Sequence, residues 1–246
     1  MVDEIASLYR RYDAWKEWSS FFEFDDEDAE YFYNETGRIP LSQKKVLEIG
    51  FGNGSFLAWA RSRGALVTGI EINARSLKEA HRAEVELLSG DIKNTAIERN
   101  EWFDLIAAFD VLEHFDIDEI TEYLCSLGKM LRPGGILILR FPNGQSPFGL
   151  LAQHGDATHK TMLSKDKIEQ LSQNTGLSSV RYEGSYRIRG RWGAKWLCRA
   201  CRSLAQSIIG FALNRIYACD IPWDSVVVMV MEKKQATTGI ISSRVP

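Results

Sequence analysis

Three glycines that follow an apolar run are the first residues in this sequence whose spacing suggests chemistry. The run Val46–Ile49 is followed by Gly50, Gly52 and Gly54. Glycines after a strand let the backbone turn tightly and let a ligand approach the main chain. A helix beginning near Gly54 would point its first N–H groups into the same space. The pattern favours a ligand-binding turn, and a tight turn without a ligand is the alternative.

Acidic residues accompany this turn at the ends of successive apolar runs. Glu48 lies beside the glycines, Glu71 ends the second run, and Asp91 and Asp110 follow the third and fourth. An acid after the second strand can accept hydrogen bonds from ribose hydroxyls. Asp91 or its neighbouring backbone could meet an adenine amino group. Each acid alone could be a surface residue or a helix cap, but their common position predicts one crevice at the carboxyl ends of strands.

The glycine spacing separates two possible cofactors. A dinucleotide site needs Gly-x-Gly-x-x-Gly around a pyrophosphate. Here the spacing is Gly-x-Gly-x-Gly, with Ser55 where the last glycine would stand. S-adenosylmethionine has no phosphate and carries a sulfonium and an amino group, which Glu48 suits. Because the acids of the crevice would repel phosphates, the pattern predicts S-adenosylmethionine as the cofactor.

Alternating strands and helices would position these residues. Apolar runs predict strands at Lys45–Ile49, Leu66–Glu71, Val85–Leu88, Phe103–Phe109, Ile136–Phe141, Ser179–Ile188 and Val226–Glu232. Helices are predicted at Ser55–Arg63, Ala74–Ala83 and Asp118–Leu131, and after Ser164 as an N-cap, with Gly176 as the end. Residues 143–162 are predicted to be a loop. This alternation predicts an α/β fold with a doubly wound, mostly parallel sheet and helices on both faces.

The motifs together resemble the class I S-adenosylmethionine-dependent methyltransferases, over about residues 44–142 and more loosely to 234. The matching segments are Val46–Gly54, Gly69–Glu71, Ser89–Asp91, Phe103–Ile106, Phe109–His114 and Met130–Gly135. The resemblance implies a Rossmann-like sheet of seven strands whose last strand is antiparallel.

The resemblance also implies a set of cofactor contacts. Gly50, Gly52 and Gly54 would lie along the methionine part, and Glu48 near its charged end. Glu71 and Ile72 would lie at the ribose. Asp91 and Ile92 would lie at the adenine. The stretch Phe109–Glu113, which includes Asp110, would line the methionine end. His114 would lie near the site and contact cofactor or substrate, or it would cap the start of the next helix.

The acceptor side is predicted from one loop, Gln153–His159, which contains two histidines and an acid. A hydroxyl that accepts a methyl group must lose a proton, and histidine suits that role because its pKa is near neutrality. His154 or His159 is the predicted base, with Asp156 orienting it. The alternatives are side chains that only order the loop, or a metal site of these three residues, whose spacing matches no zinc pattern. Methyl transfer can also proceed largely by alignment of the reactants, without a base.

The N-terminal forty residues are predicted to be a helical lid over the main domain. Leu8, Tyr9, Tyr12, Trp15 and Trp18 recur at helical spacing and would either exclude water from the site or simply pack on the domain. The acidic run Glu23–Glu30 is interpreted as a solvated face. The predicted organisation is therefore a lid at 1–40, a cofactor-binding domain at 41–234 and a tail at 235–246.

A basic amphipathic insertion is predicted at about residues 190–218. No acid occurs from Gly184 to Cys219, and Arg191, Lys195, Arg199 and Arg202 share one helical face. Beside them runs a stripe that contains Trp192, Trp196, Ala200, Leu204 and Ile208. Such a helix could lie on an anionic membrane, pack in the core or at a homodimer interface with its basic side solvated, or meet an anionic substrate. Cys198 and Cys201 are predicted to be a buried pair of thiols, since no second pair exists for zinc.

Composition excludes several classes. The net charge of −3 and the acidic N-terminal region argue against a nucleic-acid partner. The sequence has no run of 18 apolar residues, so no membrane-spanning helix is predicted. Four cysteines without a disulfide pattern favour a reducing cytoplasm.

The predicted function is methyl transfer to an oxygen of a small or glycan-type acceptor. The loop Phe141–Phe148 and the stretch His154–His159 are similar to methyltransferases of bacterial surface-polysaccharide synthesis. A cytoplasmic enzyme, peripheral on the inner membrane face, would fit an acceptor on a lipid carrier. The alternatives are a quinone or lipid methyltransferase and a non-catalytic module that keeps the fold.

Overall fold

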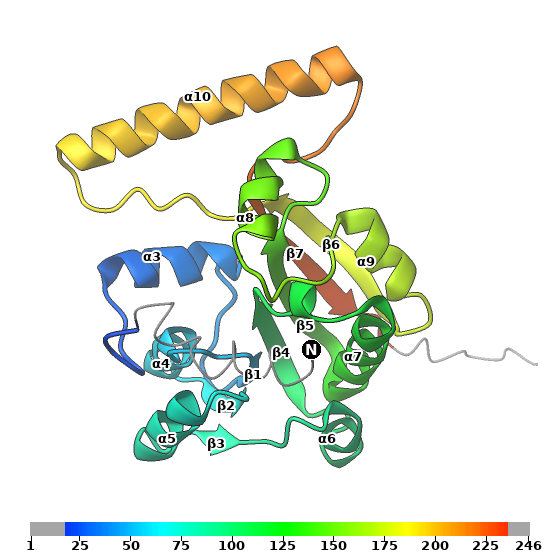
Figure 1. The fold of residues 1–246 in the computed structure, drawn as a ribbon. Helices are drawn as coiled ribbons and strands as arrows, with labels where there is room; N and C mark the ends of the chain where they lie inside the picture. Colours follow the sequence, from blue (N-terminus) through cyan, green and yellow to red (C-terminus); the bar gives the residue numbers. More distant parts are fainter. Residues whose placement is uncertain (1–17, 236–246) are drawn as a thin grey trace, which may run out of the picture.

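The computed structural model describes residues 18–235 and centres on one seven-stranded sheet (Figure 1). The strand order is β3-β2-β1-β4-β5-β7-β6. Strands β1 to β5 pair in parallel, and β7 is antiparallel to both β5 and β6. The strands are β1 (Lys45–Ile49), β2 (Leu66–Ile70), β3 (Glu86–Leu87), β4 (Phe103–Phe109), β5 (Leu131–Pro142), β6 (Leu177–Gly184) and β7 (Val226–Lys233). The predicted fold is confirmed.

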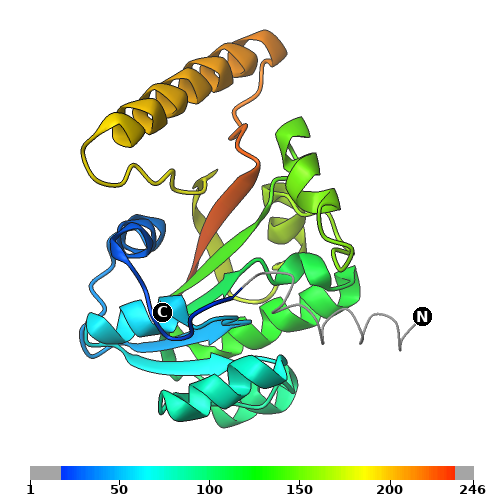
Figure 2. The same cartoon turned by 60° about the vertical axis from the view of Figure 1, so that its left-hand side comes forward.

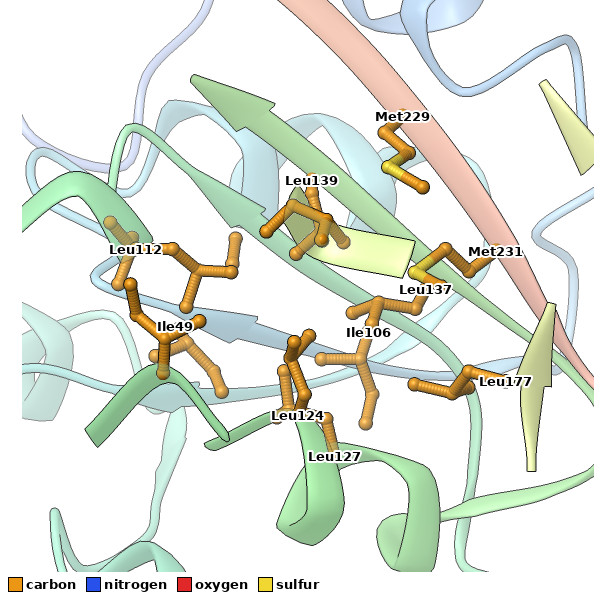
Figure 3. Packing of buried hydrophobic residues seen from close by; sticks show 14 of the residues in the cluster. Ile49, Ile106, Leu112, Leu124, Leu127, Leu137, Leu139, Leu177, Met229 and Met231 are labelled. Carbon is orange, nitrogen blue, oxygen red and sulfur yellow. The ribbon is translucent and has the colours of Figure 1, made fainter. Parts of the chain in front are cut away.

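Helices cover both faces of the sheet because alternate strand residues are apolar on each side. The helices are α3 (Asp26–Glu35), α4 (Ser55–Ser62), α5 (Ala74–Arg82), α6 (Ile92–Glu98), α7 (Ile117–Met130), α8 (Leu150–His154), α9 (Lys165–Leu171) and α10 (Ala194–Tyr217), with 3-10 turns η1 (Leu112–His114) and η2 (Pro147–Gly149). One core joins α6, α7 and α9 to residues such as Leu47 and Ile106, and Figure 3 shows part of it. The other joins α3, α4 and α5 to residues such as Val46 and Leu105.

Side-chain caps set where several helices begin. Asp25 caps α3 in a reciprocal arrangement with Asp28. Ser164 caps α9 as predicted, by accepting from the Lys167 N–H. Asp91 caps α6 by accepting from the Asn94 N–H.

Several predicted boundaries were wrong. The predicted loop 143–162 contains η2 and α8, which are too short for a periodic pattern to reveal. Helix α6 was not predicted, because its β-branched residues have low helix propensity. Helix α9 ends at Leu171 rather than at Gly176. The segment Arg132–Gly135 is counted within β5, where the register with β4 shifts.

The acidic run Glu23–Glu30 is not simply a solvated face, because two of its carboxylates bind distant parts of the chain. Glu27 pairs with Arg199 of α10, through oxygen–nitrogen distances of 2.6 and 3.0 Å. Glu30 accepts from the Tyr186 hydroxyl and from the N–H groups of Arg189 and Gly190. Helix α3 therefore fastens the segment that precedes α10 to the domain.

Helix α10 lies along one end of the molecule, beyond α3 and α8 (Figures 1 and 2). None of its residues is buried. The predicted buried pair of thiols was wrong, since Cys198 and Cys201 are both exposed. No helix of the described residues is long and apolar enough to cross a membrane. Of the predicted aromatic lid residues, only Trp18 lies in the described part of the chain, and most of the predicted tail lies beyond it.

Candidate functional site

The glycine turn after β1 takes the conformation that its residue types require. Gly50, Gly52 and Gly54 have φ angles of 67°, 53° and 75°, where residues with a Cβ are strained. A Cβ on Gly52 would lie 2.9 Å from the Trp18 ring, and one on Gly54 would lie 2.5 Å from the Phe22 ring. The Phe22 N–H also donates to the Asn53 carbonyl at 2.8 Å. The segment preceding α3 thus lies directly on this turn.

Glu71 closes the turn from the end of β2. One carboxylate oxygen accepts from the Gly52 N–H at 2.9 Å. The other accepts from the N–H groups of Ile72 and Asn73 at 2.6 and 2.9 Å. Three backbone donors therefore fix the carboxylate in place, and each oxygen has lone-pair capacity for further donors.

Glu48 is a buried carboxylate next to the glycine turn, with only 4% of its surface exposed. Its Oε2 has no hydrogen-bond partner among the described residues. Burial raises the pKa of Glu48 well above its ordinary value, nearby Glu71 raises it further, and Arg140 opposes both. A buried oxygen of this kind is costly unless a donor or cation meets it.

Asp110, just beyond β4, is held by a charged network. It has a positive φ of 54°. Its two carboxylate oxygens receive the Arg140 guanidinium from β5, with the Nε–Oδ1 contact at 3.0 Å. Arg140 also donates to the Tyr31 hydroxyl of α3 at 2.6 Å, and Tyr31 donates to Glu35 at 2.8 Å. The pKa of Arg140 is raised well above its ordinary value, because Asp110 and Tyr31 outweigh the opposing effect of burial.

The other predicted cofactor residues have mixed surroundings. Asp91 is the cap of α6, while Ile92 is 6% exposed and packs in the core. Ile72 is exposed on the loop after β2. Phe109 packs against Phe56, with ring centroids 5.2 Å apart. These positions lie at or just after the ends of β2, β3 and β4.

The donor set at the strand ends around the glycine turn fits S-adenosylmethionine. The part-buried Glu71 carboxylate offers acceptors to hydroxyls, and the unpartnered Glu48 oxygen offers one to a cation. Arg140 is already engaged by Asp110 and Tyr31, so no spare guanidinium faces a phosphate within this network. A ligand with hydroxyls and a positive charge suits these residues better than a pyrophosphate.

A second cluster joins η1 to the loop after α8. Thr158 donates its hydroxyl to Asp156 Oδ1 at 2.5 Å, and the same hydroxyl oxygen lies 2.9 Å from His114 Nδ1. His159 Nδ1 donates to the Gln153 carbonyl at 3.0 Å. This bond leaves Nε2 as the basic nitrogen of a neutral His159, at 3.9 Å from both Glu113 Oε1 and Asp156 Oδ2.

Electrostatics differ across this cluster. Burial opposes ionisation of Asp156, but hydrogen bonds from Thr158 and the nearby histidines lower its pKa overall. Burial lowers the pKa of His114, and the neighbouring His159 lowers it further. The cluster therefore holds a carboxylate beside neutral His114, an arrangement that can orient and accept protons.

Of the three predicted acceptor-side residues, the structure brings two together. His159 and Asp156 lie in the cluster, whereas His154 is exposed at the end of α8. Glu113 belongs to the cluster but was predicted at the methionine end and not on the acceptor side. It is fully buried, and its backbone carbonyl accepts from the N–H groups of Lys160 and Thr161. Glu113, His114 and His159 offer ligand atoms within 4.8 Å of one another and could hold a divalent cation.

Arg140 and Tyr31 were also missed. Arg140 is the one charged residue within the apolar run Ile136–Phe141, and a charge inside such a run is the signal that could have identified it. Tyr31 gave no such signal, because its contact with Arg140 joins residues 109 positions apart.

Comparison with known proteins places residues 21–182 in the family described as "Methyltransferase domain". Helix α10 lies outside the matched residues. The chain is 32% identical over 121 residues to the ubiquinone biosynthesis O-methyltransferase of Pseudomonas putida (strain W619), covering 47% of this chain and 51% of that protein. The chain spans about half the length of the curated relatives of this name that it matches first.

Solved structures share the fold at low sequence identity. An S-adenosylmethionine-dependent methyltransferase from Archaeoglobus fulgidus matches with a TM-score of 0.62 and 18% identity, over 84% of this chain and 92% of that chain. The 1,6-didemethyltoxoflavin-N1-methyltransferase of Burkholderia thailandensis, with S-adenosylhomocysteine bound, matches with a TM-score of 0.57 and 14% identity, over 95% and 87%. The predicted family resemblance is confirmed.

Proposed function

We infer the function of this protein from the premise that the chain belongs to the methyltransferase-domain family. We propose that it transfers the methyl group of S-adenosylmethionine to an oxygen of a small or glycan-type acceptor. The observation that carries this proposal is the pair of carboxylates at the glycine turn. Glu71 is fixed on the Gly52 N–H, and a buried Glu48 oxygen has no hydrogen-bond partner among the described residues.

The donor would be held by residues from four strand ends. Glu71 would accept from the ribose hydroxyls, with Ile72 beside it, and Asp91 and Ile92 would border the adenine. Gly50, Gly52 and Gly54 would lie along the methionine part, and Glu48 would face its positive end. Asp110, with Phe109 behind it and His114 beyond, would border the sulfonium. When bound, the cofactor supplies an electrophilic methyl group.

His159 would accept the proton of the acceptor hydroxyl at Nε2. The Gln153 carbonyl fixes the tautomer that leaves this nitrogen basic. Glu113 and Asp156, each 3.9 Å away, would stabilise the imidazolium that results. His154, the other predicted base, is the weaker candidate because it is exposed at the end of α8.

Two acceptor classes carry a suitable oxygen. A glycan hydroxyl was predicted from the loop at Phe141–Phe148. A quinone or lipid hydroxyl is favoured by relatives whose name is ubiquinone biosynthesis O-methyltransferase. Both can be presented at a membrane surface, and a peripheral contact through residues 190–218 would place the enzyme there. A homodimer through the same residues is the competing use of that surface.

Calorimetry with S-adenosylmethionine separates an enzyme from a non-catalytic module that has lost the cofactor site. We expect saturable binding of one donor per chain, and no binding at millimolar donor would contradict the proposal. Transfer of tritium from labelled donor into a cell extract, fractionated into lipid, glycan, protein and RNA, then identifies the acceptor. Label in lipid or glycan supports the proposal, while label only in protein or RNA contradicts it.

A further inference from the structure

The outward side of α10 is an apolar surface that nothing in the described chain covers. Leu197, Leu204, Ile208 and Phe211 follow one another at spacings of seven, four and three, which place them on one helical face. Each is between 59 and 64% exposed. A helix of 24 residues with no buried residue cannot be explained by packing within this domain.

Polar contacts fix which side of α10 faces the domain. Arg199 pairs with Glu27 of α3. Arg187 donates to the Ser203 carbonyl at 3.1 Å and to the Ser207 hydroxyl at 3.3 Å. The Trp223 indole N–H donates to the Asn214 side chain at 2.7 Å. These contacts lie along one face, so the apolar face is held pointing away from the domain.

Charge distinguishes the possible occupants of this face. Lys195, Arg202 and Arg215 are exposed on α10, whereas Arg199 is paired with Glu27, and the helix has no acidic residue. Packing against a second copy of the same helix would bring like charges together without any acid of the helix to pair them. An anionic lipid surface offers the complementary charge together with an apolar layer.

Aromatic residues stand at both ends of the helix. Trp192, at 87% exposed, stacks on Trp196 with ring centroids 4.6 Å apart. Tyr217, the last helical residue, is 67% exposed. Tryptophan and tyrosine favour the boundary between headgroups and acyl chains. A helix lying flat in that boundary would place both ends at the same depth.

The position of α10 in the topology sets how the rest of the domain would face a membrane. The helix connects the end of β6 to the start of β7. Because β7 is antiparallel to β5, its first residue Val226 pairs with Pro142, the last residue of β5. Helix α10 is therefore attached at the edge of the sheet where the parallel strands end, which is the edge that carries the glycine turn. Figure 1 shows β4 pointing toward this end.

We propose that α10 is a peripheral membrane anchor, with its outward apolar face in the interface of an anionic bilayer and the exposed Lys195, Arg202 and Arg215 at the lipid phosphates. The anchor would turn the edge of the sheet that carries the glycine turn toward the bilayer. The acceptor would then be a hydroxyl on a membrane-borne molecule. This identification of the acceptor rests on the proposed methyl transfer.

Co-sedimentation of the full chain with phosphatidylcholine vesicles, with or without phosphatidylglycerol, tests the anchor. We expect the protein to pellet with the anionic vesicles and to be released by salt. The double variant Leu204→Asp/Phe211→Asp should weaken partitioning about a hundredfold, since each loses the burial of a large apolar side chain. Lys195→Gln/Arg202→Gln should weaken it about fivefold for each charge.

Ile97→Asp is the matched control, because Ile97 is 76% exposed on α6, away from α10, and should pellet like the wild type. Equal pelleting of the Leu204/Phe211 variant and the wild type would overturn the anchor. The anchor would also be overturned if the wild type bound no vesicles and formed a dimer that the Leu204/Phe211 variant converted to a monomer. The vesicle assay contains no methyl donor and is therefore independent of the tritium-transfer experiment. If the protein bound vesicles but transferred no label in that separate experiment, the proposed methyl transfer alone would be overturned.

Discussion

The donor side and the acceptor side of the crevice are assembled in different ways. On the donor side, Glu48, Gly50, Glu71 and Asp110 lie at or just beyond the ends of adjacent strands β1, β2 and β4, whose register the sheet fixes. On the acceptor side, the cluster depends on one loop pinned to η1 through the Glu113 carbonyl. The strand register of the sheet therefore sets the positions of the donor-side residues, whereas the acceptor-side cluster depends on a few hydrogen bonds of one loop.

This difference predicts how each side fails. Loss of a donor-side carboxylate should weaken cofactor binding without disturbing the rest of the sheet. Loss of an acceptor-side residue should leave cofactor binding intact and stop turnover. Variants of single residues can test that separation.

The largest expected effect is on turnover from His159→Ala. Loss of a general base lowers the rate by roughly 10²- to 10⁴-fold, while the affinity for S-adenosylmethionine should stay within about twofold because His159 lies outside the strand-end set. Single-turnover rates and calorimetry measure the two quantities. His81→Ala is the control, since that histidine is exposed on α5 and should leave turnover unchanged. Unchanged turnover in His159→Ala would remove the proposed base.

The next effect is on donor affinity from Glu71→Ala. Charged hydrogen bonds are worth about 1.5–3 kcal/mol, so we expect dissociation constants for S-adenosylmethionine and S-adenosylhomocysteine to rise about 10- to 100-fold. Glu79→Ala is the control, because among the described residues that carboxylate pairs with Arg82 on the same helix, α5, and lies outside the proposed donor site. Equal affinities in the two variants would contradict the ribose role of Glu71.

The same contrast explains what the sequence could predict. Glu71 and Asp110 follow apolar runs whose alternation with helices fixes the sheet, so the position of each in the crevice could be predicted. The contact of Glu113 with His159 could not be predicted, because His159 lies 46 positions further along the chain, in a loop that follows no periodic pattern. The Arg199–Glu27 pair was invisible for the same reason, since it joins residues 172 positions apart.

Glu48→Gln should reveal the cost of keeping a carboxylate ready for a cation. Because the pKa of Glu48 is raised in the folded protein, its stabilising contribution is present at low pH and is lost as pH rises through that pKa. At neutral pH the neutral glutamine should therefore stabilise the donor-free protein by about 1–2 kcal/mol and weaken donor binding. Chemical unfolding across pH measures the first effect, and the wild type and variant should converge below the ordinary glutamate pKa. A stability gap that widens in acid would contradict this account of Glu48.

Tyr31→Phe should give the smallest effect, and it asks whether the donor side extends beyond the sheet into α3. The variant removes the acceptor of one Arg140 hydrogen bond while leaving the Asp110–Arg140 pair in place. We expect a loss of about 1–2 kcal/mol in the free energy of unfolding and a change of only a few-fold in donor affinity. Tyr33→Phe removes the same hydroxyl from an exposed position on α3 and should change neither quantity. If Tyr31→Phe weakened donor binding as much as Glu71→Ala, then α3 would share the donor site equally with the strand ends, and the sheet alone would not account for it.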